Sequence, residues 1–507
     1  MAFIDILPLS QAITGVSILF LLAYLITPLL SWSREIPGPL LAKYTRLWYM
    51  WQKYRNDFHW TNIKLHREKG AVVQIMPGYF TIDDPKAHKI IYGHGNAWKK
   101  GEFYVAWNVS SDPHATNLFA ARDQGLHASM RRKVASMYSM TSLVSYEPYV
   151  DHCIDLLHSQ LDRAASAGSA INLGRWLQFF AFDAVSIITF GERLGFLDEG
   201  KDVHEMIQSL DYTHIILTFA GVYPWLTPLF KAVAGVFTGD KLLYFQKFAS
   251  EKITMARQEH GDLAEDGPAT TMVRKFLDAQ RREPKKGLTD WDVAANAGSN
   301  IGAGSDTTAI GLIATVYYLF RDPAILERAR QEMDSEGLPD RPSFQEAQKL
   351  PFLQAVIKES MRLLPGVGLP LWREVPKGGA VVCGRFFPEG TNLGVNAWVS
   401  HHNQQVYGED ADLFRPERWQ EASGETAVAM EQSWIPFGLG SRTCIGKNVS
   451  LLEINKIIPV LVRDFDFYFQ DQHGNPETRD YITLKNKWFL KAPHLYARVV
   501  RRNLKAG

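Results

Sequence analysis

Trp434-Ile-Pro-Phe-Gly-Leu-Gly-Ser-Arg-Thr-Cys-Ile-Gly-Lys447 is the stretch that decides the fold. It presents one thiol, Cys444, at the end of a glycine-rich run that leads directly into an apolar helical pattern. Backbone N–H groups in such a turn can point at the sulfur and keep it ionised. Arg442 adds a fixed charge that suits a carboxylate, and Phe437 adds an apolar lid. The stretch therefore predicts a thiolate that holds a metal at one axial position.

The spacing of this stretch is Phe-x-x-Gly-x-Arg-x-Cys-x-Gly, and its glycines at 438, 440 and 446 allow tight turns and close approach of a flat ligand. A buried structural cysteine is the alternative, and it would be favoured for a lone thiol. The full spacing closely resembles the haem-binding loop of the cytochrome P450 family. The resemblance implies thiolate-ligated haem b with Cys444 as the axial iron ligand. It also places four neighbours at the cofactor: Phe437, Gly438, Arg442 and Gly446.

Three further cations match positions that hold the haem propionates in this family. His127 and Arg131 are four residues apart in a helical pattern, so they share one face. Alone, they would be interpreted as a solvated basic patch. The resemblance implies that both bind propionates, and that Arg373, in the extended segment after the helix ending near Leu364, does the same.

A long helix is predicted from the capping box Thr289-Asp-Trp-Asp292 to about Phe320. Gly304, Thr307 and Thr308 are poor helix formers in its middle, and such conflicts often mark function. Thr307 can bond back to the carbonyl four residues earlier. A small-residue packing face is the alternative.

The stretch resembles the oxygen-activating helix of the monooxygenases, which implies that Asp306 and Thr307 guide protons. The longer run 298–308 is similar to filamentous-fungal members related to pisatin demethylase.

Glu359-Ser-Met-Arg362 and Phe414-Arg-Pro-Glu-Arg-Trp419 are weak motifs when taken separately. Together they resemble the buried triad of the family, which implies that Glu359, Arg362 and Arg418 lock the proximal side. Trp419 replaces the more usual Phe, which is a conservative departure.

Residues 12–32 are uncharged and match the roughly 20 apolar residues that cross a bilayer as a helix. A signal peptide is the alternative, but only Asp5 precedes the segment in place of a positive region. Arg34 and Lys43 follow it, so the positive-inside rule places the rest of the chain in the cytosol. The sequence thus predicts a membrane anchor over 1–33, a proline-rich hinge over 34–40 and a catalytic domain over 41–507.

The composition excludes several other classes of protein. The 507 residues carry 55 basic and 54 acidic side chains, so no global basic field favours nucleic acid. Three widely spaced cysteines argue against a disulfide framework. Locally, we expect two strands over 72–82 and a helix capped by Asp84. We also expect loops over 99–124 and 261–290, and short strands over 465–502.

The resemblance covers residues 34–502 and implies a mainly α cytochrome P450 fold with a small β portion, beside the predicted N-terminal transmembrane helix. It implies a haem-thiolate monooxygenase that inserts one atom of O2 into an apolar small molecule, in fungal secondary metabolism. The alternatives are a haem-binding protein without turnover and an enzyme that uses or rearranges peroxide. No flavin or nicotinamide fingerprint is visible, so the implied electron donor is NADPH–cytochrome P450 reductase. The implied location is the endoplasmic reticulum membrane, single-pass, with the catalytic domain facing the cytosol.

Overall fold

A computed structural model of the chain describes residues 14, 17, 26–27, 30–95, 97–108, 115–259, 271–476 and 482–502. Most of the predicted span at 12–32, and with it the predicted anchor over 1–33, lies outside these residues. Within the described ranges no single helix combines the length and apolar character of a membrane span. One pair of helices, Asp290–Arg321 with Pro323–Glu336, passes that test together but is bent by 104°.

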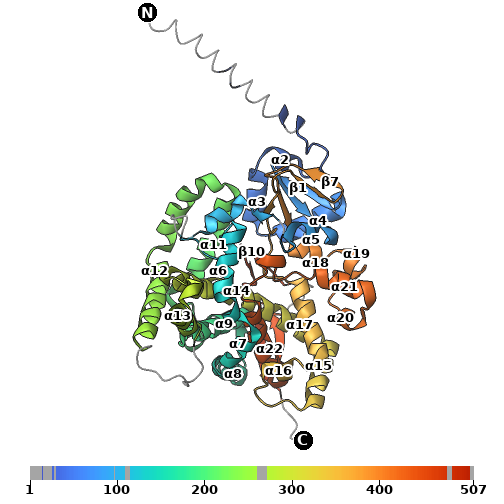
Figure 1. Ribbon diagram of the computed structural model, residues 1–507. Coiled ribbons are helices and arrows are strands. Elements are labelled where there is room, and N and C mark those ends of the chain that lie inside the picture. The colour runs from blue at the N-terminus through green and yellow to red at the C-terminus, as the bar shows by residue number, and fades with distance from the viewer. Residues whose placement is uncertain are drawn as a thin grey trace, which may run out of the picture.

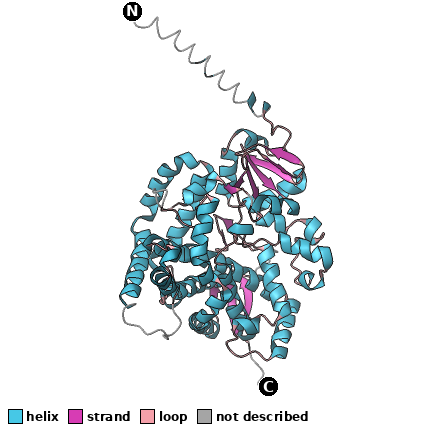
Figure 2. Ribbon diagram, in the orientation of Figure 1, coloured by secondary structure: helices cyan, strands magenta, loops and turns pink. Residues whose placement is uncertain are grey.

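Helices make up most of the molecule, and the strands gather in small sheets (Figure 2). The α-helices are α2 (Leu40–Tyr44), α3 (Leu47–Arg55), α4 (Phe58–Lys69), α5 (Pro85–Tyr92), α6 (Gln124–Val134), α7 (Met140–Leu143), α8 (Glu147–Ala167), α9 (Leu173–Phe190), α10 (Phe196–Glu199), α11 (Met206–Val222), α12 (Thr227–Glu259), α13 (Met272–Arg282), α14 (Asp290–Arg321), α15 (Pro323–Glu336), α16 (Phe344–Ala347), α17 (Pro351–Leu363), α18 (Ala397–His401), α19 (Gln404–Tyr407), α20 (Arg418–Glu421), α21 (Gly424–Ser433) and α22 (Lys447–Asp464).

The strands are β1 (Val72–Met76), β2 (Tyr79–Ile82), β3 (Lys99–Lys100), β4 (Ala170–Asn172), β5 (Arg373–Glu374), β6 (Ala380–Val382), β7 (Arg385–Phe387), β8 (Asn392–Val395), β9 (Phe465–Gln470), β10 (Lys485–Asn486), β11 (Leu490–Lys491) and β12 (Tyr496–Arg501). Short 3-10 turns include η1 (Glu102–Trp107). The fold is thus mainly helical, as the sequence predicted.

Helix α14 runs through the middle of the molecule, and α9, α17 and α22 pack against it (Figure 1). Its start is the predicted capping box, in which Thr289 and Asp292 bond each other's backbone N–H. The large apolar core lies around these helices and α8. The stretch 434–447 that carries Cys444, called the thiol loop below, leads directly into α22. The packing of α22 against α14 therefore brings the thiol loop close to the centre of α14.

A second layer is a five-stranded sheet in the order β1-β2-β8-β5-β3. Its first two strands form the predicted hairpin, and the Asp84 side chain caps α5 by accepting from the N–H of Lys86. In the outer part of the sheet, β5 pairs antiparallel with β3, and this register sets Lys100 directly opposite Arg373. The sheet therefore places two basic side chains, Lys100 and Arg373, side by side.

Two local predictions were wrong in part. Residues 271–290, predicted as loop, include α13, which is capped by the Thr271 side chain. Its polar composition hides an inner face on which Met272, Val273, Phe276 and Leu277 are buried. The stretch 99–124, predicted as loop, includes β3 and η1. In both places packing against the rest of the chain outweighs weak local signals.

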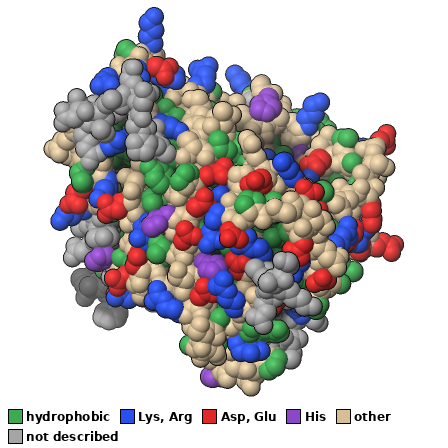
Figure 3. Space-filling model, turned by 90° about the horizontal axis from the view of Figure 1, so that it is seen from below, with side chains coloured by type: hydrophobic (Ala, Val, Ile, Leu, Met, Phe, Trp, Pro, Cys, Tyr) green, Lys and Arg blue, Asp and Glu red, His purple; other side chains and the backbone are tan. Residues whose placement is uncertain are grey.

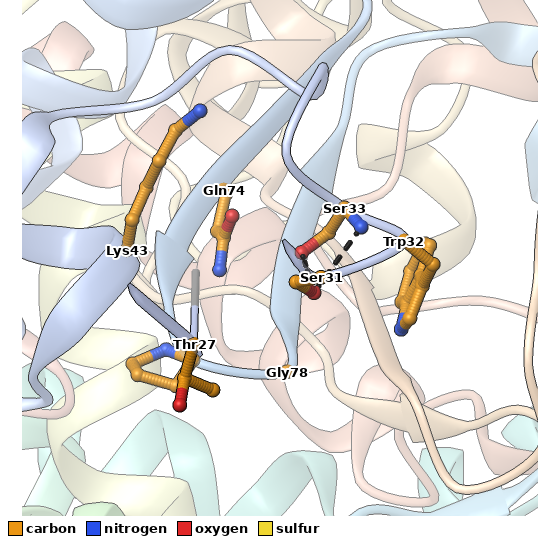
Figure 4. A pocket seen from close by; sticks show the side chains of 8 residues that line it. Thr27, Ser31, Trp32, Ser33, Lys43, Gln74 and Gly78 are labelled. Carbon is orange, nitrogen blue, oxygen red and sulfur yellow. Dashed lines mark hydrogen bonds between the residues drawn. The ribbon is translucent and has the colours of Figure 1, made fainter. Parts of the chain in front are cut away.

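Charged side chains are well mixed on the surface. In Figure 3, acidic and basic groups are interspersed among apolar ones over the face shown, in keeping with the net charge of +1. A small pocket of about 140 Å³ lies where the N-terminal segment meets the β1–β2 hairpin (Figure 4). Its lining residues are Thr27, Ser31, Trp32, Ser33, Lys43, Gln74, Pro77 and Gly78. None of these belongs to the thiol loop, so the pocket is separate from the candidate site.

Candidate active site

The thiol loop turns the Cys444 sulfur toward open space inside the protein. The backbone N–H of Cys444 donates to the carbonyl of Phe437 at 2.8 Å, which closes the loop. Protein surrounds the thiol, yet its side chain remains accessible. Burial raises the pKa of Cys444, while N–H groups of Gly446 and Lys447 and the charge of Arg131 oppose the rise. A metal cation at the sulfur would complete its ionisation.

Glycine is required at one turn of this loop. Gly440 has φ +61°, and a Cβ added there would lie 1.7 Å from the carbonyl oxygen of Tyr92. Gly438 also has a positive φ, +72°, but its nearest neighbour would be Leu371 at 3.6 Å. At Gly446 a Cβ would come within 3.9 Å of the Cys444 sulfur. The loop thus combines a forced turn with an uncrowded surface near the thiol.

Two arginines fasten helix α6 to the thiol loop. Arg131, on α6, donates to the carbonyl of Thr443 at 2.7 Å, one residue before the thiol. Arg442 reaches the other way and donates to the three consecutive carbonyls of residues 121–123, just before α6 begins. These bonds fix both guanidinium groups beside Cys444 and leave further N–H donors on each.

Lys100 is a cation at this site that the sequence reasoning missed. It is buried on β3 opposite Arg373, which is also buried, and like charges directly opposite in a sheet destabilise it. The Lys100 ammonium lies 4.4 Å from the ring centre of Tyr104 and 4.0 Å from that of Phe119. Burial lowers its pKa well below the ordinary value, and Arg373 and then Arg442 lower it further. Only the pairing of β3 with β5 reveals this residue.

His127 shows that the cations form one cluster. Burial lowers its pKa to about 3, and Arg442, Lys100, Arg131 and Arg373 each add to the shift in that order. His127 is therefore a neutral imidazole at pH 7. The structure brings it together with the three predicted arginines, from α6, β5 and the thiol loop, and Lys100 is a fifth member of the cluster.

The cluster also crowds Arg442, whose pKa burial lowers to about 10 with help from Arg373. The carboxylate of Asp123 opposes this lowering of the Arg442 pKa. Arginines and other basic side chains beside an accessible thiol fit haem, whose two propionates supply anions and whose iron supplies a cation for the sulfur. The residues present thus match the group that the sequence predicted.

On α14 the two residues of the predicted acid–alcohol pair, Asp306 and Thr307, lie on different faces of the helix. Thr307 donates its hydroxyl to the carbonyl of Ala303 at 2.8 Å, as predicted, and both residues lie on an accessible stripe of the helix. Asp306 and Thr308 are buried. Thr308 bonds Ser450 on α22 at 2.8 Å, which ties this part of α14 to the helix that follows the thiol loop.

Asp306 faces away from that stripe into a charged contact. Its Oδ1 accepts from the Gln178 side chain at 2.7 Å and forms an ion pair with the Lys491 ammonium on β11. Lys491 lies far along the sequence, and sequence reasoning missed it. The acid of the predicted pair is therefore held by a partner of opposite charge.

The three residues of the predicted triad, Glu359, Arg362 and Arg418, are in contact with one another and almost fully buried. Glu359 accepts two bonds from Arg362 at 2.8 Å and one from Arg418 at 2.9 Å. Trp419 donates its indole N–H to the same carboxylate at 2.9 Å, and the backbone N–H of Arg415 donates at 3.1 Å. The pKa of Glu359 is lowered because these bonds and charges outweigh burial. Trp419 thus contributes a donor that Phe would lack.

His401 links this triad to the thiol loop and was also missed. Its Nδ1 lies 2.8 Å from the carbonyl of Arg362, and its Nε2 accepts from the N–H of Ile435 at 2.8 Å. The two contacts fix a neutral ring with the proton on Nδ1. Burial lowers the pKa of His401 well below its ordinary value, so the ring stays neutral.

Aromatic side chains cover the region beyond Thr307. A Cβ added at Gly366 would lie 3.8 Å from the Cβ of Thr307, and its neighbour Val367 pairs with Phe489 of the C-terminal segment. The Phe489 ring meets His214 of α11 at 5.1 Å between ring centres. His214 in turn lies 5.7 Å from Trp107. Phe489, His214 and Trp107 therefore form a continuous series of ring contacts on this side of α14.

Comparison with known proteins agrees with this site. Residues 37–490 match the family described as "Cytochrome P450". A pisatin demethylase of Fusarium vanettenii is 37% identical over 484 residues, which cover 93% of this chain and 91% of the relative. A cytochrome P450 monooxygenase of Aspergillus terreus is 35% identical over 447 residues, with coverage of 85% and 90%. Another, cicH of Emericella nidulans, is 34% identical over 481 residues, with coverage of 92% and 94%. The chain belongs to the cytochrome P450 family and is a monooxygenase of that family.

Proposed function

We propose that this monooxygenase inserts one atom of O2 into an apolar small molecule in fungal secondary metabolism, and that the sulfur of Cys444 would bind the haem iron. The observation that carries the proposal is the accessible thiol of Cys444 beside five clustered basic side chains. When bound, haem supplies the iron at which O2 is reduced and an oxygen atom is transferred. The chain must then hold the cofactor, exclude water and control protons.

His127, Arg131, Arg373, Arg442 and Lys100 would hold the propionates. Charge-assisted bonds between guanidinium and carboxylate are about twice as strong as neutral ones. Burial lowers the pKa of His127, Arg442 and Lys100, and the neighbouring basic groups lower it further; two anions would relieve this mutual repulsion. Phe437, Gly438 and Gly446 would lie against the ring, because neither glycine puts a side chain between the loop and the thiol.

Thr307 and Asp306 would guide protons to the reacting oxygen. The Thr307 hydroxyl lies on the accessible stripe of α14 and already donates to Ala303, so its oxygen is free to accept from a water. Asp306 is one residue away on the buried side. Glu359, Arg362 and Arg418 would keep the proximal side rigid, since their charges satisfy one another there.

We further propose NADPH–cytochrome P450 reductase as the electron donor, and an endoplasmic reticulum location with residues 1–33 as anchor, 34–40 as hinge and 41–507 as catalytic domain. The sequence supports this proposal through its uncharged segment at 12–32 and the cations after it. The fungal relatives of similar length, a pisatin demethylase and a cytochrome P450 monooxygenase, also favour it. Deletion of 1–33 should weaken membrane association.

The decisive test is the carbon monoxide difference spectrum of the reduced protein. The wild type should show the red-shifted Soret band of thiolate haem, and Cys444→Ser should lose it. Cys383→Ser is the matched control, because this thiol lies on the β6–β7 hairpin. A histidine-type spectrum for the wild type, or an unchanged spectrum for Cys444→Ser, would refute the proposal.

A screen of apolar compounds for substrate-induced spectral shifts would then address the substrate. The panel should include methylated compounds, because one relative is named a demethylase. Product masses would separate loss of a methyl group from simple addition of oxygen.

A further inference from the structure

Lys53 of α3 is a buried basic residue for which the proposed function has no use. It is 4% exposed, and burial alone lowers its pKa to about 7. Its amino group donates to two oxygens of one residue, Asn486 of β10: the backbone carbonyl at 3.0 Å and the side-chain Oδ1 at 3.1 Å. Within the described residues it forms no ion pair with a carboxylate. A lysine buried without an opposite charge is costly, so its place calls for an explanation.

Asn486 is the junction between α3 and the segment that follows α17. It is fully buried, and its backbone N–H donates at 2.9 Å to the carbonyl of Asn56, the residue that caps the end of α3. Its side-chain Nδ2 donates to the carbonyl of Gly368, also at 2.9 Å. A Cβ added at Gly368 would lie 2.3 Å from this Nδ2, so the close approach requires glycine. One asparagine thus joins three separate stretches of the chain.

The neighbours of Asn486 decide which way its side-chain amide points. Oδ1 accepts from Lys53, whereas Nδ2 faces the carbonyl of Gly368 and, at 3.3 Å, Nδ1 of His59. A reversed amide would set a donor against the donor of Lys53 and an acceptor against the acceptor of Gly368. A donor on one side of the amide also polarises it, which strengthens the bond that the amide donates on the other side. Lys53 therefore supports the bond to Gly368 without touching it.

The two segments that this bond joins also meet beside Thr307. Val367, the residue before Gly368, pairs antiparallel with Phe489 of the turn between β10 and β11. A Cβ added at Gly366 would lie 3.8 Å from the Cβ of Thr307. A shift of the β10–β11 hairpin would therefore move Phe489 relative to Val367 next to this part of α14.

Apolar packing holds the turn of the hairpin but does not fix its position. Trp488 is 2% exposed, and its ring centre lies 5.6 Å from that of Phe103 and 4.7 Å from that of Trp107. Such contacts are non-directional, so they tolerate small sliding movements. The hydrogen bonds of Asn486 depend on angle as well as distance, and they therefore set the register of the hairpin against Gly368.

From this geometry we propose that Lys53 is a positioning residue that controls which compounds fit beside Thr307. By holding both oxygens of Asn486, it anchors the β10–β11 hairpin to α3 and sets how close Phe489 lies to Val367. It acts through the asparagine and touches no substrate itself. The inference rests on the proposed haem site, and its tests separate the two.

The first test uses two azoles that bind haem iron through a ring nitrogen. Imidazole occupies little space beyond the iron, whereas 4-phenylimidazole also places a phenyl ring against the residues around it. Dissociation constants are measured from the Soret shift of the full chain with haem bound. In Lys53→Met, which keeps the length of the side chain, the selectivity for 4-phenylimidazole over imidazole should fall roughly fivefold. Lys485→Met, at the exposed neighbour of Asn486 in β10, should leave it unchanged.

A double substitution tests whether Lys53 acts through the asparagine. Asn486→Leu should lower the selectivity by the same factor, and Lys53→Met should add nothing in that background. Additive losses, or unchanged selectivity in Lys53→Met alone, would refute the proposal. If Lys53→Met does not take up haem, Asn486→Asp decides instead. It keeps an oxygen for Lys53 but sets a second one against the carbonyl of Gly368, so the selectivity should fall, and an unchanged value would refute the proposal.

Amide hydrogen exchange keeps this inference apart from the proposed function. In Lys53→Met, exchange over residues 485–491 should be faster than in the wild type, and in Lys485→Met it should not change. Equal exchange in Lys53→Met and the wild type would refute the link through the hairpin. A carbon monoxide spectrum without the thiolate-haem band would refute the proposed haem site. In that case the exchange result would still decide whether Lys53 holds the hairpin.

Discussion

Replacing Trp419 by Phe removes one hydrogen bond from a fully buried carboxylate and leaves an aromatic ring in place. Glu359 receives five hydrogen bonds in the structure, and the indole N–H at 2.9 Å is one of them. The side chain of Glu359 is 0% exposed, so water does not replace the lost donor. A hydrogen bond to a charged group contributes about 1.5–3 kcal/mol. We therefore expect Trp419→Phe to destabilise the protein by that amount.

The expected change in melting temperature follows from the size of the chain. Unfolding entropy is about 2.1 cal/mol/K per residue, and the chain has 507 residues. The loss therefore corresponds to a Tm lower by about 1.5–3 °C. Thermal unfolding followed by circular dichroism, with a parallel urea titration, would measure it.

Trp434→Phe is a matched control for this experiment. Its indole N–H donates to the carbonyl of Lys358 at 3.1 Å, and both indole rings lie near the Lys358 ammonium. A bond between neutral groups contributes about 0.5–1.5 kcal/mol, so the control should cost about half as much. Equal losses for the two variants, or no loss for Trp419→Phe, would show that the indole does not support Glu359.

Two further predictions concern the thiol loop and the pH dependence of stability. Gly440→Ala should lower the haem content and reduce the free energy of unfolding by at least ~1 kcal/mol, because φ is positive there and the new Cβ would lie 1.7 Å from the Tyr92 carbonyl oxygen. Gly438→Ala should cost less, because its new Cβ would lie 3.6 Å from the nearest atom. A larger loss for Gly438→Ala than for Gly440→Ala would contradict the loop geometry. Burial raises the pKa of Asp83 to about 6, so the folded state binds the extra proton and stability should fall as pH rises from 4 to 6. In Asp83→Asn the urea midpoint of unfolding should change less with pH over this range. If the midpoint of the variant depends on pH as strongly as that of the wild type, another group causes the dependence.

The sequence was most informative where the residues that interact lie within a few positions of one another along the chain. The thiol loop, the capping box at Thr289 and the back-bond from Thr307 to Ala303 each span a few residues, so their geometry follows from local rules. The cap at Asp84 is of the same kind. Local signals failed at α13, where polar residues conceal the buried face.

The missed residues all act across large separations in sequence. Lys100 joins the cation cluster only through the pairing of β3 with β5, and Lys491 reaches Asp306 only because the C-terminal hairpin lies beside α14. His401 bridges Arg362 to Ile435 through a helix between them. A charged side chain or an imidazole has many possible partners, and its neighbours in sequence do not select among them.

The opposed cations Lys100 and Arg373 have a consequence for biosynthesis. Without an anion between them, their repulsion acts directly on a pairing between two-residue strands, where local opening is easiest. A ligand that binds only the folded state shifts this equilibrium by mass action. Newly made chains should then mature in proportion to the haem supply of the host. Chains that have not yet bound haem should be cleaved by cellular proteases first at this edge of the sheet.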